Sequence, residues 1–246
     1  MRSKPLSQKD EIRILKIGDS IINGGSQTDQ DSLASSILEE QLSKKFKKNI
    51  RVLNVGANSW GPDNAFEYIK KNGHFNSSLI VLVFSSHDYY DHMHFQKVVG
   101  VHPAWPSKKP FMAITDGFFK YFIPWFNNKI SRNYNAYSYL SSHNNIEYMN
   151  KGWKALFNYV NDNQIEMLVY LHPSKQEIIN GKYEDSGLKL LEVFSQNKIK
   201  FLSGIEYNAD SSLYRDFIHL NNKGQKALAN VLFTPLQAHV KANLKD

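Results

Sequence analysis

The sequence predicts an α/β fold in which a central parallel sheet of about five strands is covered by helices on both faces. Two observations lead to this prediction. Short apolar runs alternate along the chain with stretches that carry helical spacing, which is the pattern of a parallel sheet. One of these runs, LIVLVF at residues 79–84, is apolar without interruption, as expected for a strand buried on both faces.

The N-terminal part supplies three strands and two helices. The strands are predicted from the apolar runs IRILKI (12–17), IRVLNV (50–55) and LIVLVF (79–84). Leucine and isoleucine at helical spacing predict a helix over 31–48, with Asp31 or Ser32 as its N-cap. A second helix is predicted over 64–71, with Pro62 just before it.

The alternation stops between residues 88 and about 144. This segment carries several prolines and the aromatic cluster FFKYFIPWF (118–126). We interpret it as a partly helical insertion in a single domain, 1–246, rather than as a second domain. After it, the sequence predicts a helix near 145–162, a strand at 166–171, a helix near 184–197, a short strand at 199–202 and a last helix at roughly 222–241.

Composition excludes several classes of protein. The chain of 246 residues carries a formal charge of +7, but its lysines are scattered in pairs and accompany no nucleic-acid-binding motif, so no nucleic-acid partner is expected. It has no cysteine, which rules out disulfides, thiolate catalysis and cysteine-ligated zinc. No apolar run is long enough to span a bilayer. No signal peptide is visible, so we expect a soluble cytoplasmic protein, or one of the bacterial cell envelope if an N-terminal segment was trimmed. The oligomeric state is not predicted.

Residues capable of chemistry follow the ends of predicted strands, where ligands gather in such sheets. Ser20 follows the first strand, Gly56 the second and His87 the third, while Asp216 and His219 precede the last helix. A serine is a weak nucleophile unless a base takes its proton and a third group orients that base. Each element alone also fits a structural role in a turn or a helix cap; their common placement favours catalysis.

Three short motifs resemble blocks of the SGNH (GDSL-type) hydrolase superfamily. They are GDSI at 18–21, with isoleucine in place of the usual leucine, the glycine at 56, and DFIH at 216–219. The resemblance covers nearly the whole chain outside 88–144. It implies a flavodoxin-like three-layer α/β/α sandwich with Ser20 as nucleophile, His219 as base and Asp216 as its orienting partner. It also implies an oxyanion hole formed by Ser20 and Gly56.

The third block departs from the family pattern. That block usually reads Gly-x-Asn-Asp, and its asparagine donates a hydrogen bond to the oxyanion, whereas this chain reads Ser85-Ser86-His87-Asp88. Because a neutral imidazole still has one N–H, we expect His87 to replace the amide donor. The alternative is a metal site formed by His87, Asp88, Asp91, His92 and His94. No remote ligand completes that set, so no metal or other cofactor is expected.

The expected activity is serine-dependent ester hydrolysis, as an esterase or deacetylase, on an acylated small molecule or carbohydrate. The alternatives are an O-acetyltransferase that modifies a bacterial polysaccharide and a non-catalytic glycan-binding module on the same fold. Aromatic residues of the insertion are candidates for stacking on sugar rings: Trp105, Phe118, Phe119, Tyr121, Phe122, Trp125 and Phe126. The candidate substrate-binding residues are Asp19, Asn58, Asp88 and His172.

Overall fold

The structure, a computed structural model, describes residues 3, 6, 11–93, 99–100, 107–108, 112–122, 125, 148–207 and 210–244. The chain divides into two compact units, of which the first is Met1–Met93 with Tyr148–Asp246 and the second is His94–Glu147. The first unit contains the predicted catalytic, oxyanion-hole and substrate-binding residues, whereas the aromatic candidates for sugar stacking and His94 belong to the second unit. The interpretation of 88–144 as an insertion in a single domain stays a prediction.

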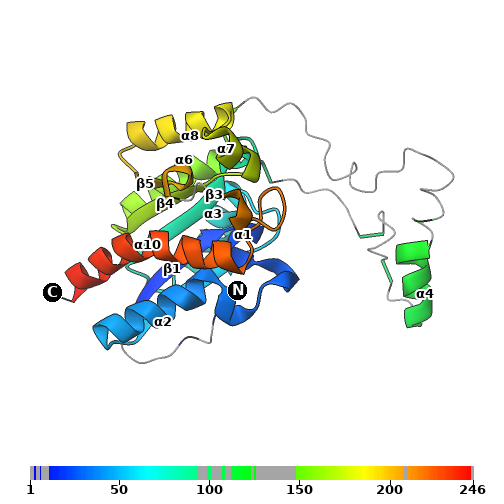
Figure 1. Ribbon diagram of the computed structural model, residues 1–246, viewed down its shortest axis with the longest axis horizontal. Helices are drawn as coiled ribbons and strands as arrows, with labels where there is room; N and C mark the ends of the chain where they lie inside the picture. Colours follow the sequence, from blue (N-terminus) through cyan, green and yellow to red (C-terminus); the bar gives the residue numbers. More distant parts are fainter. Residues whose placement is uncertain are drawn as a thin grey trace. The chain divides into compact units, whose positions relative to one another are not determined.

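The first unit is built around one parallel sheet of five strands (Figure 1). The strands are β1 (Ile12–Gly18), β2 (Ile50–Gly56), β3 (Leu79–Ser85), β4 (Glu166–His172) and β5 (Lys200–Ser203). Their spatial order is β2-β1-β3-β4-β5, with every neighbouring pair parallel. This is the flavodoxin-like order, and it confirms the predicted fold class. The chain reverses its direction of winding between β1 and β3, so the crevice at their carboxyl ends is where a ligand is expected.

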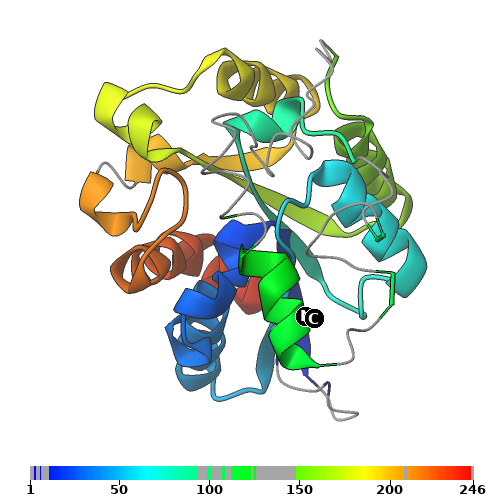
Figure 2. The same ribbon diagram turned by 90° about the vertical axis from the view of Figure 1, so that its right-hand side faces the viewer.

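Helices cover both faces of the sheet (Figures 1 and 2). One core lies under α2 (Ala34–Phe46) and α10 (Asn222–Asn243), and the other lies under α3 (Pro62–Asn72), α6 (Lys151–Asp162) and α8 (Asp185–Gln196). Alternate residues of each strand enter opposite cores, which is why the strands read as continuous apolar runs. The shorter elements are α1 (Ser20–Asn23), η1 (Gly25–Gln27), η2 (Gln30–Ser32), η3 (Ser86–Tyr89), α7 (Lys175–Asn180), α9 (Gly204–Tyr207) and η5 (Ser211–Leu213).

The start of α2 differs from the prediction. Neither Asp31 nor Ser32 is the N-cap, because residues 30–32 form the separate 3₁₀ turn η2 and the capping position falls on Leu33. The N–H of Ala34 instead donates to the buried side chain of Gln225 at 3.1 Å. A residue of α10, distant in sequence, thus satisfies a donor that a local cap usually satisfies.

The helix predicted near 145–162 begins at Lys151. Asn150 is its N-cap, and its side chain accepts a hydrogen bond from the N–H of Gly152 at 2.6 Å. Residues 145–147 lie outside the described part of the chain.

The second unit is described only in part. It contains α4 (Ala113–Gly117) and the π-helical turn η4 (Phe118–Phe122), so the expectation of partly helical structure is met for these residues. The rings of Phe118 and Phe122 stack with their centroids 4.8 Å apart. Trp105 and Phe126 lie outside the described residues. Within the ranges that the structure describes, no helix is long and apolar enough to cross a bilayer.

Lys16 is a buried cation in the middle of β1. It is 1% exposed, and its Nζ has no hydrogen-bond partner within the described ranges. Burial lowers the pKa of Lys16 to about 7. Because the unfolded chain keeps this proton up to its ordinary pKa of 10.5, unfolding takes up a proton between pH 7 and 10.5. The free energy of unfolding therefore rises with pH across that window.

We expect Lys16→Met to raise the free energy of unfolding at pH 7 by on the order of 2–4 kcal/mol, because the variant buries no ionisable group. Urea unfolding at pH 7 and pH 9 measures the effect. The wild-type protein should gain stability between these two pH values, whereas the variant should gain much less. An equal gain in both proteins would contradict the assignment of this pH dependence to Lys16.

Candidate active site

Ser20 lies at the turn that follows strand β1, which pairs with β2 on one side and β3 on the other. The side chain of Asp19 is the N-cap of α1 and accepts a hydrogen bond from the N–H of Ile21 at 2.8 Å. Ser20 is then the first residue of this four-residue helix, which ends at Gly24 in the left-handed conformation (φ 73°). The serine is therefore half-buried at the carboxyl edge of the sheet, beside the crevice between β1 and β3.

His219 reaches Ser20 from the loop that precedes α10. The Nε2 atom of His219 lies 2.8 Å from the Oγ atom of Ser20, although the two residues are 199 positions apart in sequence. The Nδ1 atom of the same ring lies 2.8 Å from Oδ2 and 3.0 Å from Oδ1 of Asp216. The structure thus brings these three predicted catalytic residues into one hydrogen-bonded array, in the order carboxylate, imidazole, hydroxyl.

The carboxylate of Asp216 also shapes its own loop. Its Oδ1 atom accepts the backbone N–H of Ile218 at 3.0 Å and that of His219 at 2.7 Å. Partial burial raises the pKa of Asp216, but the hydrogen bonds from these two N–H groups and from the imidazole outweigh it, and the net shift is downward. Asp216 is therefore ionised at neutral pH, as a partner for an imidazolium must be.

Two contacts, one from the last residue of β4 and one from the start of α7, support this loop. The backbone carbonyl of Phe217 accepts the N–H of Lys175 at 2.8 Å. The carbonyl of Ile218 lies 2.8 Å from Nε2 of His172. Burial lowers the pKa of His172 to about 4, so this ring is neutral and Nε2 donates the bond. His172, a candidate substrate-binding residue in the sequence, is fully buried and supports the loop that carries His219.

Gly56 ends β2 directly opposite Gly18 of β1. A Cβ atom at this position would lie only 2.8 Å from the carbonyl oxygen of Asp19 and from a side-chain carbon of Ile22. Any larger residue would therefore displace the turn that carries Ser20. The carbonyl of Gly56 also accepts a hydrogen bond from the side chain of Asn23 at 2.8 Å, which ties the end of β2 to the end of α1.

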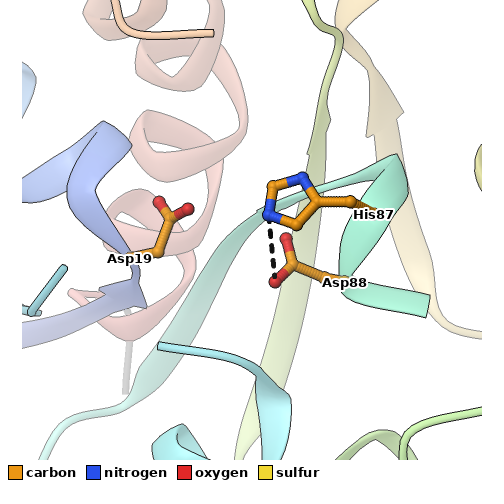
Figure 3. Close-up of side chains that lie close together, drawn as sticks. All are labelled: Asp19, His87 and Asp88. Carbon is orange, nitrogen blue, oxygen red and sulfur yellow. Dashed lines mark ion pairs between the residues drawn. The ribbon is translucent and has the colours of Figure 1, made fainter. Parts of the chain in front are cut away.

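His87 lies in η3, immediately after β3. Its Nδ1 atom is 2.7 Å from the Oγ atom of Ser85, and its side chain is 52% exposed. Figure 3 shows the ring extending from η3 toward the turn that carries Asp19. His87 therefore follows β3, whereas Ser20 follows β1 on the other side of the crevice.

Asp19, His87 and Asp88 form a close cluster (Figure 3). Asp88 is fully buried, and burial raises its pKa well above the ordinary value, although the N–H of Ser85 donates to it at 2.7 Å. Burial and then the negative charge of Asp88 raise the pKa of Asp19 to about 7. Two desolvated carboxyl groups this close disfavour each other's ionised form, so the pair tends to keep a proton.

The residue types of this cluster, two carboxylates and an imidazole, are also those that bind metal ions. One ligand atom from each of the three residues lies within 4.8 Å of the others. The ligands of a tetrahedral first-row ion are bound at about 2.1 Å and so lie about 3.4 Å apart. The Nε2 atom of His87 and the Oδ1 atom of Asp88 are 3.9 Å apart, so the cluster would have to contract to hold an ion.

Of the alternative metal set of the sequence, His87 and Asp88 belong to the cluster with Asp19. The Nε2 atom of His92 contacts the backbone carbonyl of Tyr148 at 3.1 Å. Asp88 is buried, and His94 lies outside the described residues. Of the candidate substrate-binding residues, Asn58 is exposed in the loop after β2, whereas Asp19 and Asp88 are buried beside Ser20 and His87. Burial limits these two carboxyl groups to shaping the site.

Sequence reasoning missed two contributors. Ser85 was treated only as a departure from a glycine, yet its hydroxyl contacts His87. The sequence indicates this contact only through the spacing of two residues between Ser85 and His87 across the end of the strand. The supporting role of His172 had no signal, because it depends on a contact across 46 residues of sequence.

Comparison with known proteins gives structural matches only. No protein-family model and no curated protein sequence matches the chain. An acetyl xylan esterase (AlAXEase) superposes with a TM-score of 0.55 at 14% identity, over 91% of this chain and 99% of that protein. A two-domain esterase (CEX) active on acetylated mannans, crystallised with mannopentaose, superposes with a TM-score of 0.54 at 12% identity. That match covers 92% of this chain and 50% of the esterase, so this chain spans half its length.

A member of the lipolytic G-D-S-L protein family from Veillonella parvula is also similar, at 12% identity over 89% of this chain and 94% of that protein, with a TM-score of 0.49. The two esterases with TM-scores above 0.5 each superpose on more than nine tenths of this chain. At this level of identity, the likeness establishes that the chain shares their fold.

Proposed function

We propose that the protein is a serine-dependent ester hydrolase that removes acyl groups from a carbohydrate or a related hydroxylated compound. The observation that carries the proposal is the hydrogen-bonded array of Ser20, His219 and Asp216 at the crevice between β1 and β3. Fold likeness alone does not define a function. A hydroxyl, an imidazole and a carboxylate joined in this order are the groups that acyl transfer through a serine requires.

In the first half of the reaction, Ser20 Oγ attacks the carbonyl carbon of the ester and passes its proton to Nε2 of His219. Asp216 holds the ring with Nδ1 protonated and stabilises the imidazolium that forms. His219 then gives the proton to the departing alkoxide, which leaves as a free alcohol. Ser20 retains the acyl group as an ester.

The negative charge that develops on the carbonyl oxygen requires donors near Ser20. We assign this role to the backbone N–H groups of Ser20 and Gly56 and to Nε2 of His87. Preorganised donors of this kind usually supply the largest electrostatic share of the rate enhancement. Support for Gly56 comes from its contact with the Ser20 turn, and support for His87 comes from its approach to Asp19.

In the second half, an acceptor attacks the acyl-serine and His219 acts again as general base. The side chains of His219 and Asp216 are 24% and 42% exposed, so water reaches the catalytic base. This exposure favours hydrolysis over transfer to a second alcohol. The array of Ser20, His219 and Asp216 favours catalysis over a purely binding function.

The substrate class is supported by the surroundings of the array. A pocket of about 260 Å³ adjoins His87 and is lined mainly by polar residues, together with Phe217 and Ile218. The ring of Phe217 is 71% exposed, which gives a sugar ring a flat surface for stacking. Two proteins with this fold are described as an acetyl xylan esterase and as an esterase active on acetylated mannans. An acetylated glycan is therefore the substrate that we propose.

Turnover of p-nitrophenyl acetate, with and without a deacetylated glycan acceptor, tests the proposal. Hydrolysis predicts release of p-nitrophenol and acetate at the same rate in both conditions. Release that requires the acceptor, with acetate found on the glycan, would identify an acetyltransferase instead. Absence of release under both conditions, together with glycan binding, would identify a binding module.

His87→Ala should lower kcat by about 10²- to 10³-fold, the usual effect of losing one oxyanion donor. KM should change little, because the lost bond strengthens only as charge develops on the oxygen. Initial rates over a range of p-nitrophenyl acetate concentrations separate the two constants. His74→Ala changes a histidine in the loop between α3 and β3 that contacts Tyr159 of α6, and it is the matched control. An unchanged kcat in His87→Ala would remove this residue from the site.

A further inference from the structure

Ser85, the last residue of β3, contacts both His87 and Asp88 of η3. The side chain of Ser85 is buried, and its Oγ atom lies 2.7 Å from Nδ1 of His87 and 3.2 Å from Oδ2 of Asp88. The backbone N–H of Ser85 donates to the same Oδ2 at 2.7 Å. A single hydroxyl therefore lies between an imidazole nitrogen and a carboxyl oxygen.

A serine hydroxyl has one hydrogen, so it can donate to only one of these two neighbours. If it donates to Nδ1, a neutral His87 carries its proton on Nε2 and can donate there. If it donates to Asp88, Nδ1 must carry the ring proton, and a neutral ring then presents only a lone pair at Nε2. The direction of this one hydrogen bond decides whether His87 is a donor toward the site.

The surroundings of Asp88 favour the first arrangement. The Oγ atom of Ser85 lies closer to Nδ1 of His87, at 2.7 Å, than to Oδ2 of Asp88, at 3.2 Å. Asp88 is fully buried, and burial raises its pKa well above the ordinary value; hydrogen bonds from the N–H and the hydroxyl of Ser85 oppose this shift, whereas the charges of Asp91 and Asp63 add to it. Asp19 faces Asp88 from the turn after β1, and burial raises the pKa of Asp19 as well. A carboxyl group that keeps its proton does not need the hydrogen of Ser85, which is then available to His87.

We propose that Ser85 is a positioning residue, whose hydroxyl holds the ring of His87 with Nε2 protonated and directed toward the crevice beside Ser20. This inference rests on the proposed function, because it assigns a purpose to the Nε2 donor. It also explains two departures from the resembled motif together. Ser85 and His87 stand where that motif has glycine and asparagine, and they contact each other. The serine supplies an anchor for a ring, which an asparagine side chain does not need.

A double-mutant cycle tests whether Ser85 acts through His87. Ser85→Ala keeps the backbone N–H that binds Asp88, and it should lower kcat for p-nitrophenyl acetate by about tenfold with little change in KM. In a His87→Asn background the same substitution should change kcat by less than about twofold. Ser85→Thr, which keeps the hydroxyl, should retain most of the wild-type kcat. Thermal unfolding of each variant verifies that it is folded.

Equal losses from Ser85→Ala in both backgrounds would overturn the proposal, because they would show a structural role independent of His87. No loss in the wild-type background would overturn it as well. Failure of the proposed function itself looks different: the wild-type protein would then neither hydrolyse the ester nor react with a fluorophosphonate at Ser20.

A spectroscopic measurement reads the same contact without relying on activity. In protein with ¹⁵N-labelled histidine, the nitrogen shifts of His87, assigned by comparison with His87→Gln, distinguish a protonated Nε2 from a protonated Nδ1. At alkaline pH the wild-type spectrum should show one neutral form, protonated on Nε2. Ser85→Ala should alter the Nδ1 shift and broaden or mix the two forms. Identical spectra, or a wild-type ring protonated on Nδ1, would contradict the proposal.

Discussion

Ser20→Ala is expected to reduce the turnover of p-nitrophenyl acetate by about 10⁴- to 10⁶-fold, the largest effect of any single substitution in this protein. The reason is that the variant has no atom that can form the acyl intermediate, so only binding and the oxyanion donors remain to assist attack by water. The fold should be unaffected, because the capping bond of this turn is made by Asp19 and the N–H of Ile21. Continuous measurement of p-nitrophenol release against a no-enzyme blank gives the residual rate.

Removal of the base, His219, should lower the turnover of p-nitrophenyl acetate to the same residual rate. The turnover rates of His219→Ala and of the double variant with Ser20→Ala should lie within about threefold of the rate of Ser20→Ala. The two groups act as one unit, so the losses from removing each of them do not add. Ser195→Ala removes an exposed hydroxyl of α8 that bonds only its own helix, and it should retain full activity. A double variant far slower than either single variant would indicate that Ser20 and His219 act independently.

Asp216→Asn is expected to lower kcat by roughly 10³- to 10⁴-fold, with a small change in KM. The side chain keeps its size and can still accept the N–H groups of Ile218 and His219 at Oδ1. Its amide nitrogen, however, would face Nδ1 of His219 with hydrogens of its own. The ring then takes its proton on Nε2, where it can no longer accept the proton of Ser20.

The lower end of this range is favoured because Asp216 is 42% exposed, so water can partly replace the lost carboxylate. Steady-state kinetics at several pH values check the prediction, since the variant should recover part of its activity at alkaline pH, where hydroxide supplies the base. Asp162→Asn removes an exposed carboxylate at the end of α6 and is the control. Wild-type kcat in Asp216→Asn would mean that the carboxylate does not orient His219.

The central sheet could be predicted from sequence because each strand is buried in two cores at once. That double burial requires continuous apolar runs, and all five runs became strands within one or two residues of the predicted ends. The order of the strands came from the resemblance of three short motifs rather than from the runs themselves. Helix positions were predictable for the same reason, since apolar spacing reports the buried face of each helix.

Helix ends were less predictable when distant residues set them. The start of α2 depends on Gln225 of α10, which no local pattern reveals. The short helix α7 was missed, although Ser174 and Glu177 form a reciprocal capping box that marks its start. Six residues with few apolar positions give too little periodicity to detect.

The candidate site was likewise predictable in part. The approach of Ser20, Gly56 and His219 could be predicted, because the carboxyl ends of parallel strands meet at one edge. The buried position of His172, a candidate substrate-binding residue, could not be predicted, because a histidine at the end of a strand can face either the crevice or the interior. The link from Ser85 to His87 depends on the rotamers of two side chains in a turn, which sequence spacing does not determine.

Covalent labelling of Ser20 tests the central claim most directly, namely that Ser20 is an activated nucleophile and His219 is its base. The protein is treated with a fluorophosphonate, its intact mass is measured, and the modified peptide is sequenced. One adduct per chain, on Ser20, and its loss in His219→Ala are the predicted results. No adduct, an adduct on another residue, or undiminished labelling of Ser20 in His219→Ala would contradict the account.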